Sequence, residues 1–306
     1  MKKRIAIYGC GDNYNTYIDE IKSRYRIVII IDNDPNKRSK SVVPVADILK
    51  FDFDEVLVTN TIYKDIVSDL MERGITEDRI HILTQDASLC KRSILGSSYY
   101  GQHGEDLIIA SIFAKIGVSN PSYIDIGANH PLVGSNTALL YLNGCRGLNI
   151  DANPMMMGFF ETLRPEDINL NVGVADRKGK MSFYMVSDES GLNSFSKDDI
   201  EKSGFDVKKT IVLPVITLDS IVDKYLDGVY PDLIDCDIEG LDYSVLESVS
   251  FERSFPKVIC VEVHKSEIHV FDRMMTEKAY FRFCRIGENN IYVHNSYKNL
   301  LLHIYE

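Results

Sequence analysis

The segments DCDIEG and VEVH carry residue types that could do chemistry. Asp235 and Asp237 are two residues apart, as are Glu262 and His264, so each pair points to one face if its segment is a strand. Both segments follow apolar runs, and the ends of neighbouring parallel strands meet at one edge of a sheet. Carboxylates and an imidazole gathered there could bind a divalent cation or remove a proton from a hydroxyl group.

Two chemical alternatives follow for these side chains. In the first, four residues bind Mg²⁺ or Mn²⁺, which holds and acidifies a substrate hydroxyl: Asp237, Glu239, Glu262 and His264. In the second, His264 or Asp237 acts as the base without a metal. Two structural alternatives stand beside them. Asp237 and Glu239 could cap a helix expected near Leu241, and His264 could be a surface imidazole.

A second chemical signal lies in the segments YIDIGANHP and GLNIDANP. Asp125 and Asp151 sit at the ends of their apolar runs, where open α/β sheets bind ligands. Asp151 can accept hydrogen bonds from both hydroxyls of a ribose. The first loop has no Lys or Arg to hold phosphates, and Asp125 would repel them. The pattern therefore favours a nucleoside cation over a dinucleotide, and S-adenosylmethionine fits, since it has an ammonium, a sulfonium and a free ribose.

A third segment, IAIYGCGDNY, contains part of a dinucleotide-binding fingerprint. Gly9 and Gly11 match the first two glycines, but Tyr14 stands at the third, where a glycine lets helix and strand approach. Asp32 ends the next apolar run, about where a ribose-binding acid would sit. The segment predicts either a nucleotide or nucleotide-sugar pocket, or a Rossmann-like domain that serves for docking.

The elements that would position these residues alternate apolar strands with amphipathic helices, which is typical of parallel sheets covered on both faces. We expect a small Rossmann-like domain over residues 1–85, a linker over 86–99, and a larger doubly wound α/β domain over 100–306. In the larger domain, a hairpin around GENN should follow five parallel-type strands, which are SYIDIG, GLNID, INLNVGVA, DLIDCD and KVICVEV.

Composition excludes several classes of protein. The chain has 34 basic and 45 acidic residues in 306, a formal charge of −11, which argues against general nucleic-acid binding. No apolar run is long enough to cross a membrane, and the glycines near the N-terminus interrupt any signal-like segment, so a cytoplasmic protein is expected. The six cysteines form no C-x-x-C pair and are expected to be buried free thiols.

The chain resembles the FkbM family of S-adenosylmethionine-dependent methyltransferases from Tyr100 to His294. The resemblance rests on motifs in a fixed order, which are GQHGED, YIDIGANHP with SNT, GLNIDANP, NVGVADRKG, LPVITLDSIV, PDLIDCDIEG and KVICVEVH. Two positions depart from the family pattern. Gly101 stands where the family often has serine, and Asp235 stands where it often has lysine, which adds local negative charge.

The resemblance implies a class I methyltransferase sheet and methylation of a hydroxyl group, often on a sugar. It assigns the cofactor site to ten residues: Gln102, Asp125, Gly127, Ala128, Asn129, Asn136, Asp151, Ala152, Val174 and Ala175. Of these, Val174 and Ala175 would lie near the adenine. Asp237 and His264 become the candidate catalytic residues.

Three further features could contribute to the site. Residues 186–207 are polar and bear glycine and serine, which is typical of a substrate-binding lid or of a surface loop. His103 could face a pocket or only the solvent, and the same holds for His130.

The sequence thus predicts an S-adenosylmethionine-dependent O-methyltransferase acting on a sugar hydroxyl, such as that of a nucleotide sugar or a polysaccharide precursor. Two alternatives remain. The N-terminal turn could serve an NAD-dependent oxidoreductase, or the chain could be a binding protein that keeps the methyltransferase fold without activity. A homo-oligomer is possible in each case.

Overall fold

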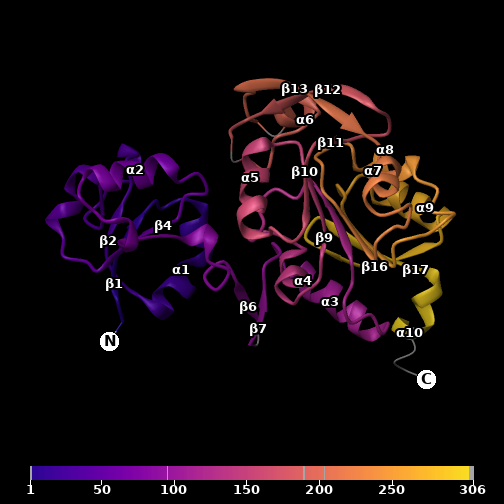
Figure 1. The fold of residues 1–306 in the computed structure, drawn as a ribbon, viewed down its shortest axis with the longest axis horizontal. Helices are drawn as coiled ribbons and strands as arrows, with labels where there is room; N and C mark the ends of the chain where they lie inside the picture. The colour runs from indigo at the N-terminus through magenta and orange to yellow at the C-terminus, as the bar shows by residue number, and fades with distance from the viewer. Residues whose placement is uncertain (1, 95, 189, 203, 303–306) are drawn as a thin grey trace. The chain divides into compact units, whose positions relative to one another are not determined.

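The computed structural model describes residues 2–94, 96–188, 190–202 and 204–302. The chain divides into two compact units, residues 1–99 and 100–306, and each is described separately below (Figure 1). Within the described ranges, no helix is long and apolar enough to span a bilayer. All six cysteines are free thiols, four of them buried and two half-buried.

The first unit is a five-stranded sheet in the order β3-β2-β1-β4-β5, with every strand pair parallel. Its apolar runs become the strands because the sheet is covered by helices and buries their side chains. The strands are β1 (Arg4–Tyr8), β2 (Arg26–Ile31), β3 (Val42–Val43), β4 (Glu55–Val58) and β5 (Ile80–Ile82), and the helices are α1 (Asp12–Arg24) and α2 (Lys64–Glu72).

The segment expected to be a linker has some structure of its own. Residues 92–94 form β6 (Arg92–Ile94) and pair antiparallel with β7 (Ser97–Tyr99). Before them, the backbone N–H groups of Leu89 and Cys90 donate to the Asp86 carbonyl, at 2.9 Å each. Cys90 is fully buried, so this segment packs as part of the first unit.

The second unit contains a seven-stranded sheet in the order β10-β9-β8-β14-β15-β17-β16. The first five strands are parallel and the last two form an antiparallel hairpin. This is the arrangement of a class I methyltransferase, as the sequence predicted. The strands are β8 (Tyr123–Ile126), β9 (Gly147–Asp151), β10 (Ile168–Asn171), β14 (Leu233–Cys236), β15 (Val258–Glu262), β16 (Tyr280–Ile286) and β17 (Asn289–His294).

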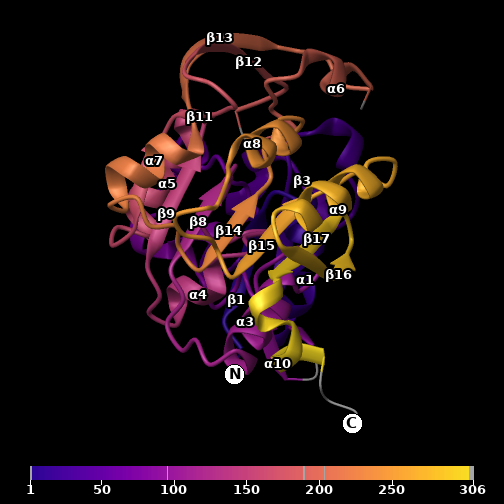
Figure 2. The same ribbon diagram turned by 90° about the vertical axis from the view of Figure 1, so that its right-hand side faces the viewer.

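Helices cover both faces of this sheet (Figure 2). Local chemistry starts several of them. For example, the Asn153 side chain accepts a hydrogen bond from Met155 N at 3.1 Å, with Pro154 as the first helical residue, which is a favoured start. The helices are α3 (Glu105–Lys115), α4 (Ala138–Leu142), α5 (Pro154–Leu163), α6 (Lys197–Lys202), α7 (Leu218–Tyr225), α8 (Asp242–Ser248), α9 (Ile268–Glu277) and α10 (Lys298–Leu302).

The sequence did not predict a three-stranded sheet in the order β11-β13-β12. The expected single strand INLNVGVA is divided, because Val172 turns the chain between β10 and β11 (Gly173–Val174). β11 then pairs with β13 (Lys209–Ile216), which also pairs antiparallel with β12 (Gly179–Met185). Both ribbon views place β12 and β13 beyond the edge of the large sheet at which α8 begins (Figures 1 and 2).

A buried guanidinium ties the β8–α4 connection to the sheet. Arg164, the residue after α5, is fully buried. It donates to Thr137 Oγ1 and Ser135 Oγ at 2.8 Å each, and to the Pro131 carbonyl. Because burial of an unpaired charge is costly, this arginine depends on nearby acids. Asp125 is one of them, and burial raises the pKa of that carboxyl while Arg164 opposes the shift.

We predict that Arg164→Met lowers the free energy of unfolding by about 3–5 kcal/mol, because it leaves buried acids without their cation and removes three anchors of the connection. Urea unfolding followed by circular dichroism measures the change. Arg177→Met is the matched control, since the Arg177 side chain is 76% exposed, and it should change stability by less than about 0.5 kcal/mol. Equal midpoints for the two variants would contradict this role.

Candidate functional site

The loop after β8 makes a close turn at the carboxyl edge of the large sheet. Gly127 has φ +79°, and its N–H and that of Ala128 donate to the Ile150 carbonyl at 2.9 and 3.1 Å. A Cβ on Gly127 would overlap the backbone carbonyl of Asp237. A glycine is therefore required both by the backbone conformation and by the close approach of the chain that follows β14.

Asp151, at the end of β9, organises the same loop. Its two carboxylate oxygens accept hydrogen bonds from Asn129 N at 2.7 Å and Asn153 N at 2.6 Å. Burial raises the pKa of Asp151 to about 6, although both backbone hydrogen bonds oppose this shift. The side chain keeps free lone pairs and lines a cavity. It can thus accept further hydrogen bonds from a ligand there.

This cavity has a volume of about 50 Å³. Its walls come from the ends of β8, β9, β11 and β14 and from the segment after β12. Phe183 of β12 and Phe195 of the segment after β12 supply two aromatic rings, whose centroids are 5.0 Å apart. A planar group could pack between this wall and the strand ends.

The residues predicted to bind the cofactor fall into two groups. Gly127, Asp151, Ala152 and Val174 line the cavity. The others lie in or near the surrounding structure: Gln102, Asp125, Ala128, Asn129, Asn136 and Ala175.

The second group holds the loops in place. Asp125 accepts from Thr137 Oγ1 at 2.5 Å, and Asn136 donates from Nδ2 to Asp235 Oδ1 at 3.2 Å. Both acids are buried, opposite each other on β8 and β14. Burial, and then Asp125, raise the pKa of Asp235 well above its usual range.

The remaining members lie close to the same loops. Ala128 packs with Met157 and Phe160, whereas Ala175 packs with the core of the small sheet. The Asn129 backbone contacts Asp151, as described above. Gln102 lies beside Gly134, where an added Cβ would be 3.6 Å from Gln102 Cγ. A direct contact of these residues with a cofactor stays a prediction.

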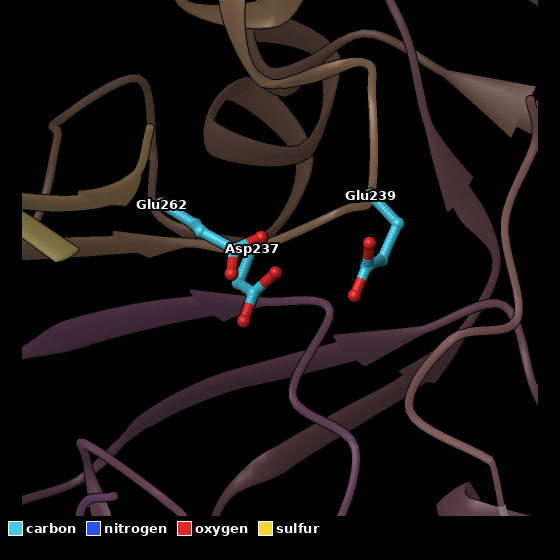
Figure 3. A group of neighbouring side chains, drawn as sticks. All are labelled: Asp237, Glu239 and Glu262. Atoms are coloured by element: carbon cyan, nitrogen blue, oxygen red, sulfur yellow. The ribbon is translucent and has the colours of Figure 1, made fainter. Parts of the chain in front are cut away.

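Three of the four predicted metal-ligating side chains come together. Asp237, Glu239 and Glu262 each offer a carboxylate oxygen, and these atoms lie within 4.8 Å of one another. Figure 3 shows their carboxylates gathered at the strand ends. Asp237 Oδ1 is buried and has no hydrogen-bond partner among the residues that the structure describes. Burial, and then Glu262, raise the pKa of Asp237 well above its usual range, as expected for acids that lie close together.

Asp242, the first residue of α8, bonds the loop between β14 and α8. It accepts from Ile238 N at 3.0 Å and from Gly240 N at 3.3 Å. Glu239 has φ +51°, an uncommon conformation for a residue other than glycine. The side chain of Glu239 lines the cavity described above.

His264 lies outside the group of three carboxylates. It is exposed, and its charge interaction with Glu262 lowers the pKa of that acid, which burial otherwise raises. A second cavity of about 140 Å³ begins at Glu239 and is lined by eight residues: Glu239, Gly240, Asp242, Tyr243, Glu262, His264, Glu267 and Phe271. His264 thus faces this second cavity together with two of the cluster's acids.

The two remaining candidate histidines, His103 and His130, differ in their surroundings. His103 is half exposed, with Nδ1 3.2 Å from Glu105 Oε1, and lies against Gly287. His130 is buried, whereas the sequence led us to expect that it faces a pocket or the solvent. Burial lowers the pKa of His130 to about 3. Its Nδ1 accepts from Leu132 N and Val133 N at 3.1 Å each. His130 is therefore a neutral residue that shapes the β8–α4 connection.

Part of the predicted lid lines the first cavity. Gly191, Asn193 and Phe195 line it, while residues 197–202 form α6. Positions 189 and 203 of the expected lid lie outside the described residues. The part that is described is thus an ordered wall of the cavity.

In the first unit, the side chain of Asp32, which follows β2, bonds the turn after β1. Asp32 Oδ2 accepts from Cys10 N and from Cys10 Sγ at 3.1 Å each, and Oδ1 accepts from Asp34 N at 2.9 Å. Burial would raise the pKa of Asp32, but these hydrogen bonds outweigh it and lower the pKa. Gly9 has φ +96°, and a Cβ there would overlap Asn60.

Several residues of the site escaped prediction. Arg164 ends a helix without any motif around it, and Phe183 and Phe195 reach the cavity through a sheet that the sequence did not reveal. Ser194 and Asn193 lie in the expected lid, but their polar side chains look like those of any loop. A buried arginine or loop contact leaves no periodic signal, because it depends on segments far apart in the chain.

Comparisons with known proteins match each unit to a family. Residues 125–283 match the methyltransferase FkbM domain family, and residues 1–81 match the C2185-like N-terminal family. No curated protein matches the chain significantly.

Three solved structures are similar to the chain at low identity. A methyltransferase FkbM from Methylobacillus flagellatus KT is 11% identical, with 95% of this chain and 90% of that chain covered and a TM-score of 0.39. A putative RNA methyltransferase from Pyrococcus horikoshii is 11% identical (62% and 80% covered, TM-score 0.32). A precorrin-6y C5,15-methyltransferase from Geobacter metallireducens GS-15 is 12% identical (61% and 85% covered, TM-score 0.32).

We predict that Gly127→Ala abolishes binding of S-adenosylhomocysteine in calorimetry, because its Cβ would push the loop away from Asp237. Gly117→Ala is the control: Gly117 has the same φ of +79°, but nothing lies within 4 Å of the position that its Cβ would take. Both substitutions strain the backbone, by about 1–2 kcal/mol, and only the first disturbs the turn. Normal binding by Gly127→Ala would contradict the assigned cavity.

Proposed function

The chain belongs to the FkbM family of methyltransferases, and on that premise we propose that it transfers the methyl group of S-adenosylmethionine to a sugar hydroxyl. The observation that supports this best is the meeting of two cavities at Glu239. One is bounded by Gly127 and Asp151, and the other is lined by carboxylates and aromatic side chains. A cofactor and an acceptor could therefore meet beside the acid cluster Asp237, Glu239 and Glu262.

The first cavity suits the cofactor. Asp151 would accept hydrogen bonds from the ribose hydroxyls, Gly127 would allow the ligand close to the backbone, and Phe183 would pack against the adenine. The cofactor supplies an electrophilic methyl group on a sulfonium. The chain supplies alignment of that methyl with the acceptor oxygen, which can contribute up to roughly 7–11 kcal/mol in favourable cases.

The second cavity suits a polyhydroxylated acceptor. The half-buried Tyr243 packs edge to face on the buried Phe271, with centroids 5.4 Å apart, and the ring of Tyr243 could meet the C–H face of a sugar. Glu262 and Glu267 can accept hydrogen bonds from sugar hydroxyls. Nucleotide sugars and polysaccharide precursors are the first acceptors to test, because the family resemblance points to sugar-containing substrates.

The acid cluster would activate the acceptor hydroxyl. A divalent cation bound by Asp237, Glu239 and Glu262 would lower the pKa of that hydroxyl and hold its oxygen. The unpartnered Asp237 Oδ1 supports such a cation, and all-oxygen ligands suit Mg²⁺ or Mn²⁺. His264, at the rim of the second cavity, or Asp237 would take the proton.

Two other functions make different demands on the chain. An NAD-dependent oxidoreductase would need Asp32 to bind a ribose. The Asp32 carboxylate, however, already accepts three hydrogen bonds, two from Cys10 and one from Asp34. A silent binding protein with this fold would bind the cofactor without turnover. Both differ from the proposal in simple binding and activity measurements.

We predict that the full-length protein binds S-adenosylhomocysteine and not NAD in calorimetry. Because the pKa of Asp151 is raised to about 6, its charged form is lost below that pH. A ribose that needs the carboxylate should therefore bind about tenfold more weakly for each pH unit below 6, with little change above it.

The variant Asp151→Asn tests the origin of this slope. It should bind more weakly at pH 7 and show little pH dependence between pH 5 and 8. Asp106→Asn is the control, because burial also raises the pKa of Asp106 to about 6, but this residue does not line the cavity. Binding of NAD alone, or an unchanged slope in Asp151→Asn, would overturn the assignment.

We predict that radiolabelled methyl transfer to an accepted nucleotide sugar stops on addition of EDTA and returns with Mg²⁺ or Mn²⁺. Asp237→Asn should lower kcat by about 10²-fold or more while S-adenosylhomocysteine still binds. Asp176→Asn, at a half-exposed position outside both cavities, should be active. Turnover in EDTA would favour the metal-free base over the cation, and absence of turnover with every sugar acceptor would contradict the sugar proposal.

A further inference from the structure

Glu239 is held in its position by contacts on both sides. Its φ of +51° is disfavoured for a residue with a Cβ, so the surroundings must stabilise it. Asp242 bonds the amides of Ile238 and Gly240, the residues that flank Glu239. These bonds fix the loop, but they leave the Glu239 carbonyl to another partner.

That partner is Ser194. Its hydroxyl donates to the Glu239 carbonyl at 2.6 Å and accepts from Ser196 N at 2.8 Å. Ser194 is 2% exposed, so water does not compete for this bond. Two backbone hydrogen bonds join Ser194 to Tyr184 on β12, at 2.8 and 3.0 Å. The small sheet therefore fixes Ser194, and Ser194 in turn contacts the backbone of a cluster acid.

The residues around Ser194 form the wall of the cofactor cavity. Asn193 accepts from Val186 N and donates to the Ser187 carbonyl, at 2.8 Å each, which closes the loop on itself. Phe195 packs on Phe183. The same short segment thus lines the cavity through Asn193 and Phe195 and bonds the backbone of Glu239 through Ser194.

We propose that Ser194 is a positioning residue, which holds Glu239 so that its carboxylate meets those of Asp237 and Glu262. The inference rests on the proposed function, because it assumes that these three carboxylates bind a cation. It links the wall of the cofactor cavity to the cation site through one hydroxyl. Ser194 itself contacts neither the cation nor the acceptor.

Titration of the full-length protein with Mn²⁺, followed by electron paramagnetic resonance, tests this role. Ser194→Ala should raise the Kd for Mn²⁺ by between about two- and tenfold, the usual effect of one hydrogen bond. The Kd for S-adenosylhomocysteine should change less than about twofold, because Ser194 does not itself line the cavity and its hydroxyl donates to the backbone carbonyl of Glu239. Ser194→Thr, which keeps the hydroxyl, should retain Mn²⁺ affinity.

Ser190→Ala is the matched control. The Ser190 hydroxyl lies in the same segment and accepts from Leu192 N at 3.2 Å, but it does not bond Glu239. Its Mn²⁺ affinity should equal that of the wild type. A loss as large as that of Ser194→Ala would mean that any change in the segment disturbs the site, and would overturn the specific role.

A double-mutant cycle shows whether Ser194 acts through Glu239. Glu239→Gln alone should weaken Mn²⁺ binding, and adding Ser194→Ala should have no further effect. An equal effect of Ser194→Ala with and without the Glu239 carboxylate would overturn the inference. The inference would also be overturned if the wild-type protein bound S-adenosylhomocysteine but not Mn²⁺. The proposed methyl transfer would still stand after that result. Failure to bind either ligand would instead reject the proposed function.

Discussion

The buried Arg164 guanidinium is the constraint on which the second unit depends. It joins the β8–α4 connection to the sheet through Thr137, Ser135 and the Pro131 carbonyl. The Coulomb attraction to Asp125 offsets part of its desolvation. Because a lone buried charge is unstable, the arginine and its acids must come together as a set. This set places the loop after β8, which lines the first cavity.

A second constraint is steric. Gly127 leaves no room between the turn after β8 and the Asp237 carbonyl, so this turn and the acid cluster are neighbours across a backbone contact. Asp151 then bonds the same loop through Asn129.

The small sheet adds what the large sheet lacks. Parallel strands end in an open edge, and here β12 and the segment after it carry Phe183 and Ser194 over that edge. The aromatic ring forms a wall, and the hydroxyl contacts Glu239. The first unit, in contrast, uses its polar groups internally, since Asp32 bonds its own turn.

The sequence by itself determined the alternation of strands and helices, the Gly127 turn and the acids at the strand ends, because each depends on periodicity or on neighbouring residues. It predicted the sheet of the second unit and three of the acids that come together. Only the tertiary structure decided that Asp125 is buried and bonds Thr137, that His264 stands apart from the cluster, and that Ser194 contacts Glu239. These facts depend on segments far apart in the chain, whose packing no local pattern records.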